Sequence, residues 1–297
     1  MKIVIAGSSG FIGSHLVPFL QEKGHELILL SRTSKHKAQY WNPEAGQIDP
    51  SAIEGANVVI NLCGASIVGR WNEKKMEELR ESRFISSKFL CDTIMHLRNP
   101  PKLYISASAI GYYGDRGDKV LTETSLSGHG YLAEICRRWE SIPEKLTKKS
   151  VRVVLARFGP VLGEGGGILK RMKKPFQMGF GAVLGSGKQM MSWIALDDVL
   201  EGIIYLIDHP EISGPVNFVS PHAVTNYEFT KTMAHLLNRP VFITVPRFAL
   251  SFLFGSGGSE VFLSSTHVQP ERLLKSGFHF AYSNIEPALK KYLQINT

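Results

Sequence analysis

The sequence KIVIAGSSGFIG, residues 2–13, decides the fold. Residues 2–6 form a short apolar run rich in β-branched side chains, and the glycine-rich segment that follows is typical of a strand ending in a tight turn. From Phe11 onward, apolar residues recur at helical spacing as far as Gly24, a residue typical of a helix C-terminus. Residues 26–30 (ELILL) then have the character of a second buried strand. Residues 2–30 therefore predict a β-α-β unit.

Three glycines, Gly7, Gly10 and Gly13, lie in the predicted strand-to-helix turn. In dinucleotide-binding folds the first permits the turn, the second lets a pyrophosphate approach the backbone, and the third lets the helix pack on the strand. The spacing here is Gly-x-x-Gly-x-x-Gly, which on its own also fits a turn that merely packs well. Its position between a strand and a helix favours a dinucleotide site. We expect the cofactor to contact Gly7, Gly10, Phe11, Ile12 and Gly13.

The end of the second predicted strand indicates which dinucleotide is bound. NAD-specific folds place Asp or Glu there to hold the ribose 2′-hydroxyl, whereas this chain has Ser31 and Arg32. No carboxylate at this point would repel a 2′-phosphate, and an arginine can bind phosphate oxygens through two N–H groups. The residues favour NADP(H). The alternative is an exposed arginine without a ligand.

Composition limits the remaining possibilities. The 297 residues suffice for one large α/β domain with a smaller lobe, and the three cysteines show neither C-x-x-C spacing nor companion histidines. We expect a reduced, cytoplasmic protein without a metal site. The formal net charge of +8 comes from dispersed basic residues with few interleaved aromatics, so we expect no nucleic-acid partner. The cluster at 170–174 would suit an anionic ligand. No apolar run approaches membrane-spanning length, and we expect no membrane partner.

Further apolar runs extend the pattern. Buried strands are predicted at 57–62, 102–106, 151–156 and 214–219, and a long helix at 72–96. The fold class is therefore α/β, a doubly wound parallel Rossmann sheet with a smaller interwoven α/β lobe. We assign residues 1–163 and 193–220 to the nucleotide-binding domain, and residues 164–192 and 221–297 to the substrate or C-terminal lobe.

Several local expectations accompany this assignment. Residues 38–50 should be irregular, and residues 172–191, which include Phe176 and Phe180, should line the cleft or pack in the core. Asp197 and Asp198 are spaced to cap the helix that follows them. The apolar run 248–254 is too short to span a bilayer, and predicts a helix buried in the lobe or placed at a subunit contact. The chain would be a monomer or a homodimer.

Motifs along nearly the whole chain resemble the extended short-chain dehydrogenase/reductase and epimerase superfamily. They include the glycine turn, Ser106 to Ser108, Tyr113-Gly114, residues 157–163 (RFGPVLG) and residues 193–199 (WIALDDV). A narrower set is similar to its NAD(P)-binding epimerase-family subgroup, which has its own C-terminal domain. That set comprises Arg70-Trp71, Ser82-Arg83, residues 106–114, residues 132–136, Trp139-Glu140, residues 163–167 and residues 270–274. Members of the subgroup are described as nucleoside-diphosphate-sugar epimerases.

The resemblance implies a catalytic set of Ser or Thr, Tyr, and a Lys four residues after the Tyr. The lysine lowers the pKa of the tyrosine so that it can transfer a proton while hydride moves to or from the nicotinamide. Ser108, or Ser106, matches the serine position, and Tyr131 matches the tyrosine. Ile135 stands where the lysine is required, and an apolar side chain cannot lower the pKa of Tyr131. Tyr112 and Tyr113 are the other tyrosines that could polarise a carbonyl.

The small residues after the strand at 57–62 leave room for a ligand at the edge of the sheet, so Leu62, Cys63 and Gly64 should border the cofactor. The resemblance adds Arg83, Val161 and Glu78, and supports Ser31 and Arg32. Two functions follow. The protein is an NADP(H)-dependent epimerase or oxidoreductase acting on a small, anionic or nucleotide-linked substrate, or it is a non-catalytic NADP(H)-binding regulatory or sensor protein.

Overall fold

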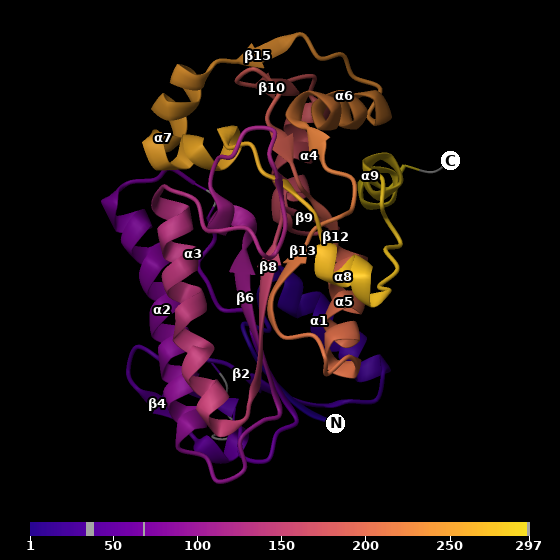
Figure 1. The fold of residues 1–297 in the computed structure, drawn as a ribbon. Coiled ribbons are helices and arrows are strands. Elements are labelled where there is room, and N and C mark those ends of the chain that lie inside the picture. Colours follow the sequence, from indigo (N-terminus) through magenta and orange to yellow (C-terminus); the bar gives the residue numbers. More distant parts are fainter. Residues whose placement is uncertain (34–38, 68, 296–297) are drawn as a thin grey trace.

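The computed structural model describes residues 1–33, 39–67 and 69–295. A parallel sheet of six strands forms its centre, in the order β13-β8-β6-β5-β1-β2 (Figure 1). The strands are β1 (Lys2–Ala6), β2 (Glu26–Leu30), β5 (Val58–Asn61), β6 (Leu103–Ala109), β8 (Arg152–Phe158) and β13 (Gly214–Phe218). This confirms the predicted fold class, a Rossmann-like α/β sheet.

Helices cover both faces of this sheet (Figure 1). On one side lie α1 (Phe11–Glu22) and α5 (Leu196–Asp208), and on the other lie α2 (Glu73–Met95) and α3 (Tyr131–Ser141). Alternate residues of β1 enter different cores: Ile3 and Ile5 pack on the first side, and Val4 and Ala6 on the second. A continuous apolar strand is what a parallel sheet buried on both faces requires.

The sequence placed the ends of these elements closely. The helix predicted at 72–96 is observed at Glu73–Met95, where the Asn72 side chain caps it by accepting a hydrogen bond from the Lys75 N–H at 2.9 Å. Gly24 has a φ of 78° directly after α1, the left-handed conformation expected at a helix C-terminus.

Short elements connect the large ones. Among the described residues, five pairs of short strands accompany the sheet: β3 (Trp41–Asn42) with β4 (Gln47–Ile48), β7 (Val120–Leu121) with β16 (His267–Val268), β9 (Val161–Leu162) with β12 (Ile194–Ala195), β10 (Ala182–Leu184) with β15 (Ile243–Val245), and β11 (Met190–Met191) with β14 (Val224–Thr225). Turns of 3₁₀-helix occur at Pro50–Ala52, Ile110–Tyr113 and Ile142–Lys149. The segment 38–50, expected to be irregular, thus contains the β3-β4 hairpin among its described residues.

The remaining helices belong mainly to the C-terminal part of the chain. They are α4 (Gly167–Gln177), α6 (Asn226–Leu236), α7 (Arg247–Leu263), α8 (Glu271–Ser276) and α9 (Ile285–Leu293). Phe176 of α4 and Phe229 of α6 belong to the same buried cluster as Ile3 and Ile5 of β1. One apolar core therefore joins the sheet to these helices, and the domain boundaries assigned from the sequence stay a prediction.

Three local expectations need correction. Ala195 is the N-cap of α5 and makes no side-chain cap. The Asp198 carboxylate instead accepts hydrogen bonds from the backbone N–H groups of Ala281 at 2.7 Å and Tyr282 at 3.1 Å, because the chain returns to this point from far along the sequence. Phe176 packs in the core, whereas Phe180 is exposed. Helix α7 leaves Phe248 and Phe252 in solvent, so its expected burial in the lobe is wrong, while its alternative, a subunit contact, stays a prediction.

The ring of Phe11, in the first turn of α1, packs against the glycine-rich loop 163–167. A Cβ atom added at Gly166 would lie 2.1 Å from Phe11 Cδ2, and one at Gly163 would lie 2.9 Å from Phe11 Cζ. These distances are far shorter than any normal carbon contact. An aromatic side chain of the first turn of α1 therefore requires glycine at position 166, and at position 163 it does so together with the Leu196 side chain.

We predict that Gly166→Ala lowers the free energy of unfolding by about 1–3 kcal/mol, because the new methyl group would overlap the Phe11 ring. Chemical denaturation measures this. In a Phe11→Leu background the same substitution should cost less, since the smaller side chain leaves room. Equal costs in the two backgrounds would show that the ring does not set the requirement for glycine.

Candidate functional site

The order of the sheet reverses between β1 and β5, because the chain passes from β1 to β2 on one side and then returns to β5 on the other. Ligands of open α/β sheets bind at such a reversal, outside the carboxyl ends of the strands. Gly7 follows β1 there with a φ of 85°, and a Cβ on Gly7 would lie 2.8 Å from the carbonyl carbon of Leu62. The glycine turn and residues 62–64 therefore border one crevice.

The three glycines of the turn differ in how closely neighbouring atoms of the chain pack against them. A Cβ at Gly13 would lie 2.3 Å from the Gly7 carbonyl oxygen, so contacts within the chain demand glycine at both 7 and 13. A Cβ at Gly10 would meet only that same oxygen, at 3.3 Å. The chain restricts position 10 less than positions 7 and 13, because a Cβ there would meet a single atom and at a longer distance.

The N-terminus of α1 lies at this glycine turn. Its N-cap is Gly10, which provides no side-chain hydrogen bond to the first turn. The N–H groups of a helix's first turn, together with the helix dipole, attract an anion such as a pyrophosphate. The Phe11 ring packs on the loop 163–167 and Ile12 is half-buried against the core. At a helix N-terminus we therefore expect these two residues to offer a ligand their backbone N–H groups and not their side chains. Val161 lies in β9 beside that loop.

Ser31 and Arg32 lie at the carboxyl end of β2. The Ser31 hydroxyl oxygen accepts a hydrogen bond from the Thr33 N–H at 3.2 Å. The Arg32 side chain is 67% exposed, and its ion pair with Glu44 has an N–O distance of 3.8 Å, too long for a strong hydrogen bond. Arg32 is thus available to bind an anionic group at this end of the crevice.

Cys63 continues β5 into the crevice, where its N–H donates to Asn61 Oδ1 at 3.1 Å. Burial raises the pKa of the Cys63 thiol to about 12, while the positive charge of Arg32 acts in the opposite direction. The thiol is therefore protonated at neutral pH and borders the site as an uncharged side chain.

Arg83 reaches toward the crevice from α2. Its guanidinium donates to the carbonyl oxygens of Leu79 at 2.9 Å and Ala65 at 3.1 Å, and a Cβ at Gly64 would lie 3.2 Å from Arg83 Cζ. Burial lowers the pKa of Arg83, and nearby Cys136, Glu78 and Tyr131 oppose that effect. Glu78 itself is exposed and forms an ion pair with Lys75 at 3.0 Å. Arg83 is held firmly at the crevice, whereas Glu78 is on the solvent side.

Ser108 is part of a buried polar network. Its hydroxyl donates to Glu140 Oε1 at 2.6 Å, and Arg157 binds both oxygens of that carboxylate, Nε to Oε1 at 2.8 Å and Nη2 to Oε2 at 2.7 Å. The Arg157 and Glu140 side chains are only 3% and 7% exposed. Burial alone would lower the pKa of Arg157, but the hydrogen bonds and charge of Glu140 outweigh burial and raise it. The Ser108 proton is thus committed to a carboxylate inside the protein.

The network continues toward the C-terminal segment. Arg157 Nη1 donates to the Tyr113 hydroxyl at 2.9 Å, and that hydroxyl donates to Asn217 Oδ1 at 2.7 Å. Tyr113 is completely buried, and burial raises its pKa to about 12. Tyr112 stacks on Arg157, with 3.5 Å between the guanidinium carbon and the ring centre. Tyr113 therefore cannot reach a substrate, and Tyr112 is engaged by the same arginine.

Tyr131 begins α3, and its hydroxyl donates to the Met76 carbonyl oxygen of α2 at 2.5 Å. Burial raises the pKa of Tyr131, against the opposing charges of Arg80 and Arg83. Ile135, where the resemblance requires a lysine, is buried on the apolar face of α3. The hydroxyls of Ser108 and Tyr131 thus donate to different partners, Glu140 and Met76, and share no hydrogen bond that the structure describes.

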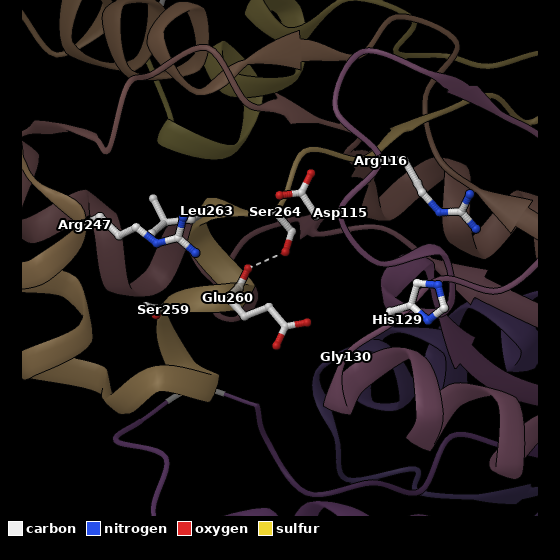
Figure 2. Close-up of a pocket in the computed structure, with 9 residues that line it drawn as sticks. All are labelled: Asp115, Arg116, His129, Gly130, Arg247, Ser259, Glu260, Leu263 and Ser264. Atoms are coloured by element: carbon white, nitrogen blue, oxygen red, sulfur yellow. Dashed lines mark hydrogen bonds between the residues drawn. The ribbon is translucent and has the colours of Figure 1, made fainter.

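A cavity of about 520 Å³ opens directly before Tyr131, between the loop that precedes α3 and the second half of α7 (Figure 2). A Cβ at Gly130 would lie 2.4 Å from Glu260 Oε1, so glycine is required for this carboxylate to point where it does. Burial and the charge of Asp115 raise the pKa of Glu260. The Ser264 hydroxyl donates to the Glu260 carbonyl oxygen at 2.7 Å (Figure 2). The cavity is lined by Asp115, Arg116, His129, Gly130, Arg247, Ser259, Glu260, Leu263 and Ser264.

The sequence analysis assigned no role to Glu140, Arg157 or the lining of this cavity. A signal for Glu140 existed, because it follows Ala133 and Cys136 at helical spacing on the buried face of α3. Arg157 ends an apolar strand, where a charge must have a partner. The cavity had no local signal, since it joins segments more than a hundred residues apart.

Two negative findings complete the description of the site. Within residues 1–33, 39–67 and 69–295, no group of three or more His, Cys, Asp or Glu side chains could hold a metal ion. In the same part of the chain, no helix is long and apolar enough to cross a membrane.

Most of the chain matches two known protein families. Residues 3–219 match the NAD dependent epimerase/dehydratase family, and residues 245–292 match a domain of unknown function, DUF1731. The second match contains α7, α8 and most of α9.

Individual relatives cover nearly the full length. Epimerase family protein Mb2239 of Mycobacterium bovis is 39% identical over 290 residues, which span 97% of this chain and 96% of that protein. Human epimerase family protein SDR39U1 is 30% identical over 295 residues, 98% of this chain and 99% of that protein. A crystal structure of human SDR39U1 (isoform 2) with NADPH has a TM-score of 0.92, with 28% identity and complete coverage of both chains.

The buried ion pair leads to a test of stability. We predict that Glu140→Gln lowers the free energy of unfolding by about 3–5 kcal/mol, because it leaves the Arg157 charge buried without its counter-ion. Thermal or urea denaturation measures the effect.

The control is Glu134→Gln on the same helix, whose ion pair with Arg138 is exposed and should contribute only about 0.3–0.5 kcal/mol. If the two variants lose equal stability, the buried pair does not hold the end of the sheet together.

Proposed function

This chain belongs to the NAD dependent epimerase/dehydratase family, and from that premise we propose that it binds NADP(H) in the crevice between β1 and β5. The observation that carries this proposal is the contrast at Gly10, which the chain restricts less than the closely packed Gly7 and Gly13. A pyrophosphate would bind the N-terminus of α1 there. The bound dinucleotide would supply the ability to accept or donate a hydride.

The preference for NADP(H) rests on Arg32. Its guanidinium is exposed at the carboxyl end of β2, and its ion pair with Glu44 is a long one. An arginine at this position can bind a 2′-phosphate with two parallel hydrogen bonds. The presence of NADPH in the crystal structure of human SDR39U1 supports the same choice. Leu62, Cys63, Gly64 and Arg83 would border the remainder of the cofactor.

We further propose that turnover by the Ser-Tyr-Lys route is weak or absent, and that the protein is an NADP(H)-binding regulatory or sensor protein. Three observations support this. The Ser108 proton is committed to Glu140, the Tyr131 hydroxyl donates to Met76, and Ile135 provides no positive charge. A tyrosine whose pKa lies above its usual value is a poor base at neutral pH.

The cavity at Gly130 favours a second candidate, an NADP(H)-dependent epimerase or oxidoreductase. A small polar substrate would bind there beside Tyr131, with Arg247 and His129 available to an anionic group and Glu260 to hydroxyl groups. Tyr131 would have to exchange its bond to Met76 for one to the substrate. Arg80 and then Arg83, whose positive charges lower the pKa of Tyr131, would be the cations that take the part of the absent lysine.

We also propose a cytoplasmic location. Cys63, Cys91 and Cys136 are free thiols, and Cys91 and Cys136 are buried, as in proteins of reducing compartments.

The choice of cofactor can be measured by calorimetry. We predict that Arg32→Ala weakens NADPH binding by about 1.5–3 kcal/mol, the range for a hydrogen bond to a charged group, and hardly changes NADH binding. Equal losses for the two dinucleotides would contradict a role for Arg32 at the 2′-phosphate.

Two further variants serve as controls for this measurement, one expected to abolish binding and one expected to leave it unchanged. Gly10→Val should abolish binding of both dinucleotides while the protein stays folded, because its side chain would occupy the pyrophosphate space. Arg137→Ala, an exposed arginine of α3, should change neither affinity.

Turnover is tested with Tyr131→Phe. We predict that wild type oxidises NADPH very slowly against a panel of carbonyl compounds and sugar nucleotides at neutral pH, and that Tyr131→Phe is equally slow. Because the pKa of Tyr131 is raised, any tyrosine-dependent rate should increase only well above neutral pH. Rapid oxidation by wild type that is lost in Tyr131→Phe would establish the enzyme instead.

A further inference from the structure

One end of the molecule carries large apolar side chains in solvent. Phe242, Phe248 and Phe252 are 90%, 77% and 79% exposed. With them are the exposed residues Phe180, Ile243 and Leu253, and we call these six residues the apolar end. Monomeric soluble proteins rarely expose a contiguous apolar patch of this kind unless it binds something.

The six residues come from neighbouring elements. Strands β10 and β15 pair in parallel with Ala182 opposite Ile243, which places Phe180 and Phe242 at the same end of the two strands. Pro246 follows β15 and α7 begins at once, so Phe248 and Phe252 lie on its first turns, four residues apart on one helix face. Figure 1 shows β10, β15 and the first half of α7 together at the top, away from the N-terminus and β2.

The exposed helix is firmly attached to the protein. Leu250, between the two phenylalanines, is buried, and the Trp71 N–H donates to the Phe254 carbonyl oxygen at 2.8 Å. A Cβ at Gly255 would lie 2.5 Å from the Trp71 carbonyl oxygen, so α7 bends closely against that residue. The fold therefore holds α7 by one side and presents Phe248 and Phe252 on the other.

The two stretches of chain that form and flank the apolar end carry only positively charged Lys and Arg side chains, and no Asp or Glu. Residues 165–196 and 229–259 contain α4, β10, β15 and most of α7, and neither stretch has a single Asp or Glu. The chain has 34 Lys and Arg against 26 Asp and Glu, so these two stretches hold the whole basic excess of eight: Lys170, Arg171, Lys173, Lys174, Lys188, Lys231, Arg239 and Arg247. The rest of the protein is balanced.

We propose that the apolar end is a docking surface for an anionic lipid bilayer. Exposed Phe and Leu side chains insert at the boundary between headgroups and acyl chains, and Lys and Arg beside them bind acidic headgroups. The cytoplasmic leaflet carries the negative lipids that such a surface needs. The expectation of no membrane partner rested on the absence of a spanning segment, which does not bear on peripheral contact.

The charge also decides against a second copy of the chain on this surface. A symmetric dimer brings the same patch of both subunits together, so basic residues of the stretches 165–196 and 229–259 of one subunit would face those of the other. Like charges in that arrangement oppose association. An anionic bilayer is complementary to both properties of the surface, its apolar side chains and its positive charge.

Vesicle co-sedimentation with the full chain tests the proposal. We expect binding to phosphatidylcholine vesicles that contain phosphatidylserine, little binding to phosphatidylcholine alone, and loss of binding as salt is added. Phe248→Ser/Phe252→Ser should reduce the binding by about tenfold or more. Lys188→Glu, an exposed residue in the turn after β10, should also weaken it.

Matched controls lie outside the six residues of the apolar end and outside the two acid-free stretches. Leu126→Ser removes an equally exposed apolar side chain, and Lys148→Glu reverses an exposed basic one, and neither should alter vesicle binding. NADPH affinity, measured in parallel, confirms that every variant is folded. Absence of binding to anionic vesicles overturns the proposal. So does a dimer in analytical ultracentrifugation that Phe248→Ser/Phe252→Ser dissociates, since the surface would then bind a second copy.

Discussion

The close packing of backbone at the β1–α1 turn is the constraint on which the rest of the structure depends. With 2.3 Å between a Cβ at Gly13 and the Gly7 carbonyl oxygen, no other residue lets α1 start so near the strand. That start directs the helix N-terminus into the crevice and sends the Phe11 ring against the loop 163–167. The same few atoms therefore position a candidate anion site and join the sheet to the segment that leads into the C-terminal helices.

The second constraint is the buried ion pair of Arg157 and Glu140. A charged pair this deep is stable only when its hydrogen bonds are satisfied, and the pair engages Ser108, Tyr113 and Tyr112 for that purpose. The hydroxyl of Ser108, which the resemblance assigned to chemistry, thereby completes an internal network.

The crevice between β1 and β5 could be predicted as a place in the fold because its signals are local. Gly10, Ser31, Arg32 and Cys63 follow directly on strands whose apolar runs are visible in the sequence, and parallel strands align their carboxyl ends. The cavity before Tyr131 could not be predicted, since Gly130 and Glu260 meet only after the C-terminal segment folds back. The exposure of α7 was also hidden, because an apolar run has the same sequence whether it is buried or faces solvent.

By itself the sequence determined the β-α-β unit, the parallel sheet and the glycine turn, because apolar periodicity and glycine's backbone freedom act over a few neighbouring residues. Only the tertiary structure decided which hydroxyls are free. The bond from Ser108 to Glu140 spans 32 residues and that from Tyr131 to Met76 spans 55. The packing of helices on the sheet determines these partners. Whether the Ser108 and Tyr131 hydroxyls are free to bind a substrate therefore depends on the folded chain.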